Sequence, residues 1–465
     1  MNESHTGTLL ARLLLLLALW RAAFPQARSH RRATRQALGG LVCLGRRTLS
    51  RVIWTNGDQH RSWGADYFLH ARCQWEPQQL FEPILEQALE YCPGRLVGVA
   101  VDETRLRKTG RCIPQAFYQR DPLSPPFHCN LMLGLRFLQA SLLAPAYRQA
   151  PVNCRALPIR FQEVSAVKRP RRNASEELWQ QYRLARKRYN LSQAFVKMMG
   201  DLRRALDQAG GKSKALVVAG DGSFCNRTCF APLLERTQLI ARTRKDAVLC
   251  FRAPPDSRRF YGVEKFTPEQ VRQDESIWWK QTKLFYGGKR RQIRYKELRP
   301  VYWQGGARRR VLRLLVVAPT PYRKRKSSRL YYRQPAYLLT TDLESSAKHL
   351  LQIYFDRWQI EVNHREEKDT LGVGQAQLWN PTAVPKQPVL AVAAYSALLL
   401  AGLQAFGAER GAAYAPLPKW RRHAKRASCL DLVTLLRKEM AEQPKLVQDL
   451  RLQPSYLGLT AAADA

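Results

Sequence analysis

The sequence predicts an α/β protein with a mixed sheet, and three observations carry this prediction. The apolar runs LVGVAV (96–101) and ALVVAG (215–220) have the composition of buried strands, and each is followed directly by an aspartate. Segments such as WEPQQLFEPILEQALEYC (75–92) repeat apolar residues at helical spacing. From residue 245 to about residue 335, aromatic and basic residues alternate around turn glycines, which is typical of antiparallel strands.

The charge of the chain is its most informative bulk property. The 465 residues include 77 Lys and Arg against 37 Asp and Glu, which gives a net charge of +40. A surplus of this size predicts a polyanionic partner, with DNA as the first candidate and an anionic membrane or a heparin-like polysaccharide as the second. A hydrophobic content of 45% indicates a globular rather than a disordered chain.

These patterns divide the chain into five predicted parts. We expect a helical N-terminal DNA-binding region, the first part of a core, a basic β-rich insertion, the second part of the core, and a basic C-terminal tail or helix. Their ranges are 1–95, 96–244, 245–335, 336–408 and 409–465.

The cysteines and the apolar runs indicate in which cellular compartment the protein is expected. The ten cysteines are scattered without a CxxC pair, so we expect reduced, mostly buried thiols and neither a zinc site nor a disulfide framework. The run LLARLLLLLALW (9–20) resembles a signal-peptide core, but Arg12 interrupts it, so a buried first helix is favoured. The Ala-rich run at 389–406 is likewise expected to be a core helix. We therefore expect a cytoplasmic protein with no membrane partner.

The stretch YFDRWQIEVNHREEK (354–368) shows an unusual helical pattern. On a helix, four polar side chains fall within roughly 60° of one another, with apolar residues on either side. These four are Tyr354, Arg357, Glu361 and Lys368. The opposite, polar side carries Asp356, Gln359, Asn363 and Glu366. A buried structural salt bridge would explain the pattern, and so would a carboxylate directed into a site where cations meet an anion.

Three carboxylates from separate elements are candidates for metal binding. Asp102 and Asp221 each follow an apolar strand, and Glu361 lies on the predicted helix. Together they can hold two Mg²⁺ or Mn²⁺ ions, because these hard cations prefer oxygen ligands. Alternatives remain: Asp102 and Asp221 can serve only as turn residues, Glu103 can replace Asp102, and Asp246 competes for the second position although it more plausibly pairs with neighbouring bases.

The spacing Tyr-x₂-Arg-x₃-Glu-x₆-Lys at Tyr354, Arg357, Glu361 and Lys368 resembles the signature of one branch of DDE transposases of the bacterial insertion-sequence type. DETRLRKTG after Asp102 and AGDGSF at Asp221 also look like blocks of that family. The resemblance implies a ribonuclease-H-like core interrupted by a β-rich insertion between the second Asp and the Glu. It implies metal-dependent cleavage at transposon ends followed by strand transfer, with Asp102, Asp221 and Glu361 as catalytic metal ligands.

The resemblance also implies how DNA is held. Tyr354, Arg357 and Lys368 would contact phosphates around the cleaved end, and two paired ends imply a homodimer. An aromatic side chain would stack on a flipped base, with eligible residues Trp278, Trp279, Trp303, Tyr331 and Tyr337. The basic helical stretch 175–208 and the segment RRTLSRVI (46–53) are further candidates for DNA contact. The rival functions are a nuclease or resolvase on the same core and a non-catalytic DNA-binding protein derived from a transposase.

Overall fold

The computed structural model describes residues 8–110, 112–121, 124–125, 127–144, 154–325, 327–421, 424–448 and 450. The chain forms two compact units. Unit 1 comprises Met1–Tyr91, Glu103–Lys168 and Gln359–Ala465, and unit 2 comprises Cys92–Asp102 and Arg169–Trp358. The five predicted parts follow a different division, and they stay predictions. The last fifteen residues of the predicted C-terminal part lie outside the described residues.

Unit 2 is built on a mixed sheet, which confirms the predicted α/β class. Its strands in spatial order are β1 (Leu96–Arg107, of which the part to Asp102 belongs here), β5 (Ala215–Gly220), β6 (Thr237–Arg242), β14 (Ala336–Thr340), β11 (Val311–Val317), β10 (Lys289–Tyr302), β7 (Leu249–Arg252) and β8 (Tyr261–Phe266). The first three strands are parallel, and the later pairs are antiparallel. β9 (Lys280–Tyr286) also pairs with β10, and β12 (Pro321–Tyr322) forms a small hairpin with β13 (Tyr331–Tyr332).

The segment 245–335 is therefore rich in antiparallel strands, as its alternating composition predicts. The helices of unit 2 are α6 (Glu176–Arg188), α7 (Leu191–Gln208), α8 (Arg227–Phe230), α9 (Pro268–Gln273), α10 (Gln304–Ala307) and α11 (Ala347–Asp356), with a 3₁₀ turn η6 (Gly222–Phe224). The basic stretch predicted as helical over 175–208 is two helices, because the chain leaves the helical conformation at Tyr189 and Asn190 caps the second one.

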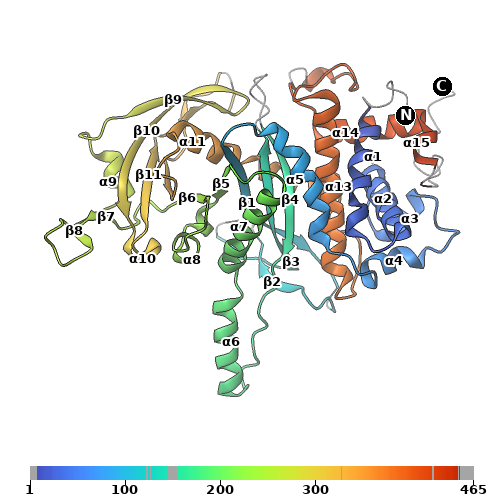
Figure 1. The fold of residues 1–465 in the computed structure, drawn as a ribbon, viewed down its shortest axis with the longest axis horizontal. Coiled ribbons are helices and arrows are strands. Elements are labelled where there is room, and N and C mark those ends of the chain that lie inside the picture. Colours follow the sequence, from blue (N-terminus) through green and yellow to red (C-terminus); the bar gives the residue numbers. More distant parts are fainter. Residues whose placement is uncertain are drawn as a thin grey trace. The chain divides into compact units, whose positions relative to one another are not determined.

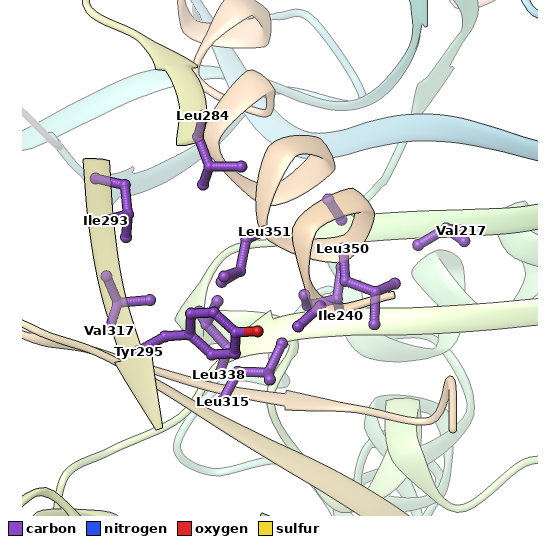
Figure 2. Packing of buried hydrophobic residues seen from close by; sticks show 12 residues of the cluster. Val217, Ile240, Leu284, Ile293, Tyr295, Leu315, Val317, Leu338, Leu350 and Leu351 are labelled. Atoms are coloured by element: carbon purple, nitrogen blue, oxygen red, sulfur yellow. The ribbon is translucent and has the colours of Figure 1, made fainter. Parts of the chain in front are cut away.

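Helix α11 packs on one face of this sheet. Leu350 and Leu351 of α11 are fully buried among Val217 of β5 and Ile240 of β6, as Figure 2 shows. The same cluster continues to Ile293, Leu315, Val317 and Leu338 on the antiparallel strands. This apolar contact fixes the helix against the parallel strands, close to Asp102 within β1 and to Asp221 directly after β5.

Unit 1 combines helices with a smaller antiparallel group of strands. The N-terminal helices are α1 (Leu9–Ala18), α2 (Ala27–Val42), α3 (Leu49–Thr55), α4 (Gly64–Ala71) and α5 (Glu82–Ala88), with 3₁₀ turns η2 (Leu19–Ala23), η3 (Pro77–Phe81) and η4 (Leu89–Tyr91). β3 (Leu131–Ala144) pairs with β2 (Phe117–Arg120) and β4 (Arg155–Glu163). The C-terminal part holds α12 (Gln359–Arg365), the π-helical turn η7 (Glu366–Thr370), α13 (Ala383–Phe406), η8 (Lys419–Arg421), α14 (Cys429–Glu442) and α15 (Pro444–Gln448).

Helix α13 forms the centre of unit 1. By length and composition it is apolar enough to cross a membrane, but 78% of its most apolar window is buried inside the structure, as predicted for a core helix. Helices α1, α2 and α14 pack around it (Figure 1). The apolar run at the start of the chain is the buried helix α1, with Leu10, Leu13 and Leu17 fully covered.

The cysteines agree with the expectation of reduced thiols. All ten are free, and six of them are buried, namely Cys43, Cys92, Cys154, Cys229, Cys250 and Cys429. Their burial explains their presence in a chain without disulfides, because a free thiol packs as a small apolar side chain.

Candidate active site

Asp102 and Asp221 lie at equivalent positions where the parallel pairing of β1 with β5 ends. Asp221 directly follows β5, as predicted, but the prediction that Asp102 follows its strand is wrong, because β1 continues to Arg107. The register of β1 with β5 pairs Leu96 with Ala215 and Ala100 with Ala219. Continuing this register by two residues brings Asp102 opposite Asp221. The pairing of β1 with β5 thus places two carboxylates on neighbouring strands, as the sequence predicts from the two apolar runs.

Both carboxylates lie on the face of the sheet that α11 covers. Side chains alternate along a strand, so Asp221 shares its face with Val217 and Ala219, which belong to the core under α11. In β1 the same alternation groups Asp102 with Gly98, and a Cβ atom built on Gly98 would lie only 3.0 Å from Ile353 Cγ1 of α11. The glycine therefore allows α11 to approach the strand, and the approach brings the end of the helix near the carboxylates.

The C-terminal end of α11 supplies a cation to Asp102. Arg357, which caps α11, places Nη1 3.6 Å from Asp102 Oδ2, and the two side chains are 13% and 17% exposed. The separation describes an ion pair rather than a direct hydrogen bond. Both groups are largely removed from water, so their opposite charges attract each other with little screening by solvent. The ion pair thereby connects one residue of the predicted signature, Arg357, with one predicted metal ligand, Asp102.

Tyr354 lies one turn before Arg357 on the same helix. The Arg357 guanidinium is 5.9 Å from the centre of the Tyr354 ring. Burial raises the pKa of the Tyr354 phenol above its usual value, while the nearby Arg357 and Arg242 lower it and Asp221 raises it. The phenol therefore stays protonated near neutral pH and can donate a hydrogen bond to an anion in this region.

Asp221 also caps the turn that follows β5. Its Oδ1 accepts hydrogen bonds from the backbone N–H and the hydroxyl of Ser223, at 2.9 and 2.6 Å. The capping role given above as an alternative is thus present in the structure. It does not exclude metal binding, because both bonds use Oδ1 and a carboxylate has a second oxygen.

Arg242 is a site residue that the sequence patterns did not single out. It ends β6 and shares its face with Ile240 of the core, so strand alternation directs it to the α11 side of the sheet. Its charge acts on Tyr354, which places it in the same neighbourhood. The alternation in the strand QLIARTR (238–244) could have indicated its direction, because it places Arg242 on the opposite face from the buried Leu239 and Ala241.

The competing carboxylates are engaged elsewhere. Glu103 follows Asp102 on β1, so strand alternation directs it to the other face, and it pairs with Arg105 at 2.6 Å. Asp246 accepts two hydrogen bonds from Arg244, at 2.9 and 2.6 Å, in an exposed ion pair. The prediction that Asp246 pairs with a neighbouring base is confirmed.

Glu361 and Lys368 belong to unit 1. Glu361 lies on α12 and Lys368 in the π-helical turn η7, and both side chains are partly exposed. Within the described ranges, no group of three or more His, Cys, Asp or Glu side chains is arranged to hold a metal ion. The convergence of Glu361 with Asp102 and Asp221 accordingly stays a prediction, whereas the aspartate pair alone offers the oxygen donors that Mg²⁺ or Mn²⁺ prefers.

The predicted single helix through 354–368 is wrong in its continuity. Helix α11 ends at Asp356, two turn residues follow, α12 begins at Gln359, and a π-helical turn begins at Glu366. The side predicted to be polar and opposite the site is buried. Its members Asp356, Gln359, Asn363 and Glu366 are 7%, 8%, 3% and 9% exposed. Trp358, expected among the flanking apolar residues, is instead 58% exposed.

A hydrogen-bond network explains why two of those polar groups, Asn363 and Glu366, are buried. Asn363 donates to the Ala156 carbonyl at 3.1 Å and to the Tyr395 hydroxyl at 2.9 Å, and it accepts from Ser141 at 3.0 Å. The Tyr395 hydroxyl donates to Glu366 at 2.6 Å. These bonds satisfy the polar atoms that burial removes from water and hold α12, which carries Glu361, against β3, β4 and α13.

The aromatic residues predicted for base stacking differ in their availability. Trp278 is 86% exposed. Trp279 lies near the Arg294 and Lys296 cations, and Trp303 packs edge-on against Phe230. Tyr331 packs against Tyr322, and Tyr337 is buried with its hydroxyl donating to Glu269.

The chain is similar to one protein family and to a solved structure. A family model described as "DDE superfamily endonuclease" matches residues 21–310, a range that includes Asp102 and Asp221 and stops before Glu361. Among solved structures, the piggyBac transposase in a synaptic complex with hairpin DNA is 14% identical, with 100% of this chain and 84% of that chain covered at a TM-score of 0.33, a likeness too low to carry an argument. No curated protein matches the chain.

Proposed function

Because the chain belongs to the DDE superfamily endonucleases, as the match over more than half of its length shows, we propose that it is a transposase of the insertion-sequence type. In this proposal the enzyme cleaves DNA at the ends of a mobile element and joins them to target DNA. The proposal includes a ribonuclease-H-like core that segment 245–335 interrupts. It also includes membership of the branch marked by the Tyr-Arg-Glu-Lys spacing.

The observation that carries the proposal is the pairing of Asp102 with Asp221 on one face of the parallel strands. Two adjacent carboxylates suit a divalent cation, and Glu361 is the proposed third ligand. Two bound Mg²⁺ or Mn²⁺ ions would supply an activated nucleophile and stabilise the leaving oxygen of a phosphodiester. The protein's own contribution is to hold these carboxylates on a rigid sheet edge, where β1 and β5 are fixed by backbone pairing.

The cationic and phenolic groups beside the aspartates suit a DNA phosphate. Arg357 and Arg242 provide donors in a fixed geometry, and the protonated Tyr354 adds a neutral donor. In the proposed complex these groups orient the scissile strand, and Lys368 contacts a neighbouring phosphate. The ion pair between Arg357 and Asp102 then holds both side chains in position before DNA arrives.

The proposed chemistry is tested by comparing DNA cleavage by variants of the three carboxylates with cleavage by a control variant. Asp102→Asn, Asp221→Asn and Glu361→Gln are each expected to reduce Mn²⁺-dependent cleavage of a plasmid carrying the DNA that flanks the gene by at least about a hundredfold, since a metal contributes several kcal/mol to the transition state. Glu103→Gln is the control, because it removes a carboxylate on the adjacent residue that pairs with Arg105. Undiminished cleavage by any of the three variants removes that residue from the proposed site.

Strand transfer separates the transposase from a nuclease or resolvase on the same core. Joined products of element ends and target DNA are expected from the transposase, and cleavage without joining would favour the nuclease. The proposed partners are element ends and target DNA held by a homodimer in a bacterial cytoplasm. For recognition of the ends we propose α3, because Ser50, Arg51 and Trp54 lie on its exposed side.

A further inference from the structure

Helix α6 has no buried residue over its thirteen positions. Figure 1 shows it continuing beyond the N-terminal end of α7, within the same unit. A helix of this length is marginal in water when nothing packs against it, so its local sequence must stabilise it. Because no side of α6 is buried against the rest of the chain, its side chains are accessible to a binding partner.

The ends of α6 are stabilised by charge and capping. Ser175 accepts a hydrogen bond from the backbone N–H of Leu178. Glu176 and Glu177 occupy the first turn, and Arg186, Lys187 and Arg188 occupy the last turn. This order complements the helix dipole at both ends.

The sequence around α6 is strongly basic. Residues 168–188 contain eight Lys and Arg and two Glu. One part of the surface is occupied internally: the Arg169 guanidinium lies 5.5 Å from the centre of the Trp179 ring, and that of Arg186 lies 5.6 Å from the Tyr182 ring. The adjoining part of the helix exposes Arg183 and Lys187 one turn apart, with Gln180 and Leu184 beside them. Arg183 forms an ion pair with Glu176 of the same helix, and both side chains stay more than half exposed, so the pair is weak and a phosphate can replace the carboxylate.

The position of α6 connects it with the candidate active site. The start of α7 lies beside the turn that follows Asp221, because Asn226 donates to the Ser192 hydroxyl at 3.0 Å. The rings of Phe195 and Phe224 stack at 4.1 Å in the same place. Since α6 directly precedes α7, the C-terminal end of α6 lies close to the turn that follows Asp221.

We propose that α6 contacts duplex DNA beside the cleaved phosphate, with Arg183 and Lys187 on the phosphates of one groove. The proposal rests on the proposed function for the identity of the substrate, and it adds a contact surface outside the metal site. Thirteen residues of helix are about 20 Å long, which corresponds to roughly six base pairs of B-form DNA. Duplex DNA is the partner that the charge favours, because six net positive charges within 21 residues would repel a second copy of the same helix.

The first test is the salt dependence of DNA binding by the full chain without divalent metal, so that cleavage plays no part. With a duplex of about 30 base pairs, Arg183→Ala/Lys187→Ala should make the slope of log affinity against log salt shallower by about 1.8, because two phosphate contacts are lost. Alanine keeps the helix, since it has the highest helix propensity. Gln180→Ala/Gln181→Ala on the same helix is the control and should leave the slope unchanged. An unchanged slope in the double Arg/Lys variant overturns the proposal.

The second test identifies what lies on the exposed side. A photo-crosslinking amino acid at Leu184, which is 66% exposed, should link to the duplex. A cross-link to a second copy of the chain, or none to DNA under conditions where the protein binds DNA, overturns the proposal. Neither test depends on catalysis. If the carboxylate variants cleave DNA normally, the proposed chemistry fails while the α6 contact stands. If the α6 variants bind DNA with an unchanged salt slope, the α6 contact fails while the proposed chemistry stands.

Discussion

The ion pair between Arg357 and Asp102 makes a quantitative prediction. At 3.6 Å and an effective dielectric constant near 20, the attraction of two unit charges is roughly 4–5 kcal/mol. Most of this attraction is offset by removing both groups from water, so we expect a net coupling of about 1–2 kcal/mol. The coupling links the end of α11 to the end of β1, and it is present before any metal or DNA binds.

A double-mutant cycle measures this coupling. The wild-type chain, Asp102→Asn, Arg357→Gln and the double variant are compared by urea unfolding without divalent metal. Each single variant removes one charge of this pair and leaves the other largely buried. The double variant should therefore be destabilised by less than the sum of the two single variants. Arg105→Gln combined with Asp102→Asn is the control pair and should be additive. A coupling below about 0.3 kcal/mol between Asp102 and Arg357 would refute the reasoning.

Three further perturbations probe the elements that support the site. Gly98→Ala should cost about 1–3 kcal/mol because its Cβ would lie 3.0 Å from Ile353 Cγ1. Ile353→Ala removes that atom, so the added cost of Gly98→Ala should disappear in the Ile353→Ala background; an equal cost in both backgrounds, measured by thermal unfolding, would contradict the close approach of α11. Asn363→Ala should cost roughly 2–3 kcal/mol by leaving buried partners unsatisfied, and an unchanged urea midpoint would exclude the network. Burial raises the pKa of Glu367 to about 8, so the native chain keeps a proton that the unfolded chain releases above the ordinary pKa of 4.5. The free energy of unfolding should therefore fall as the pH rises from about 5 to 8, and Glu367→Gln should make that fall smaller. An identical pH profile in the variant would exclude Glu367 as its source.

The neighbouring positions of Asp102 and Asp221 were predictable from the sequence because their signals are local, although β1 continues past Asp102 to Arg107. Each apolar run of β1 and β5 is directly followed by its aspartate, and backbone pairing alone then brings Asp102 next to Asp221. The buried helices α1 and α13 were predictable for the same reason, since their composition resembles a membrane segment but their lengths and polar interruptions fit a core.

The signature segment was less predictable because its surroundings decide its form. A helical projection assumes one continuous helix with one covered side, whereas the chain turns after Asp356 and leaves α-helical geometry again at Glu366. Asn363 is buried because Ser141, Ala156 and Tyr395 satisfy it, and these partners lie far away in sequence. Arg242 was missed because a single arginine at a strand end is a weak signal until α11 is placed over the same face.

Iron-mediated cleavage of the polypeptide tests the central claim most directly. Fe²⁺ substitutes for Mg²⁺ at oxygen sites and, with ascorbate and peroxide, generates radicals that cut the backbone near its ligands. If Asp102, Asp221 and Glu361 share bound metal, cuts should appear near all three positions, should be suppressed by Mg²⁺, and should be lost together in Asp221→Asn. Cuts near only one of these carboxylates, or a pattern unchanged by Asp221→Asn, would contradict a common metal centre.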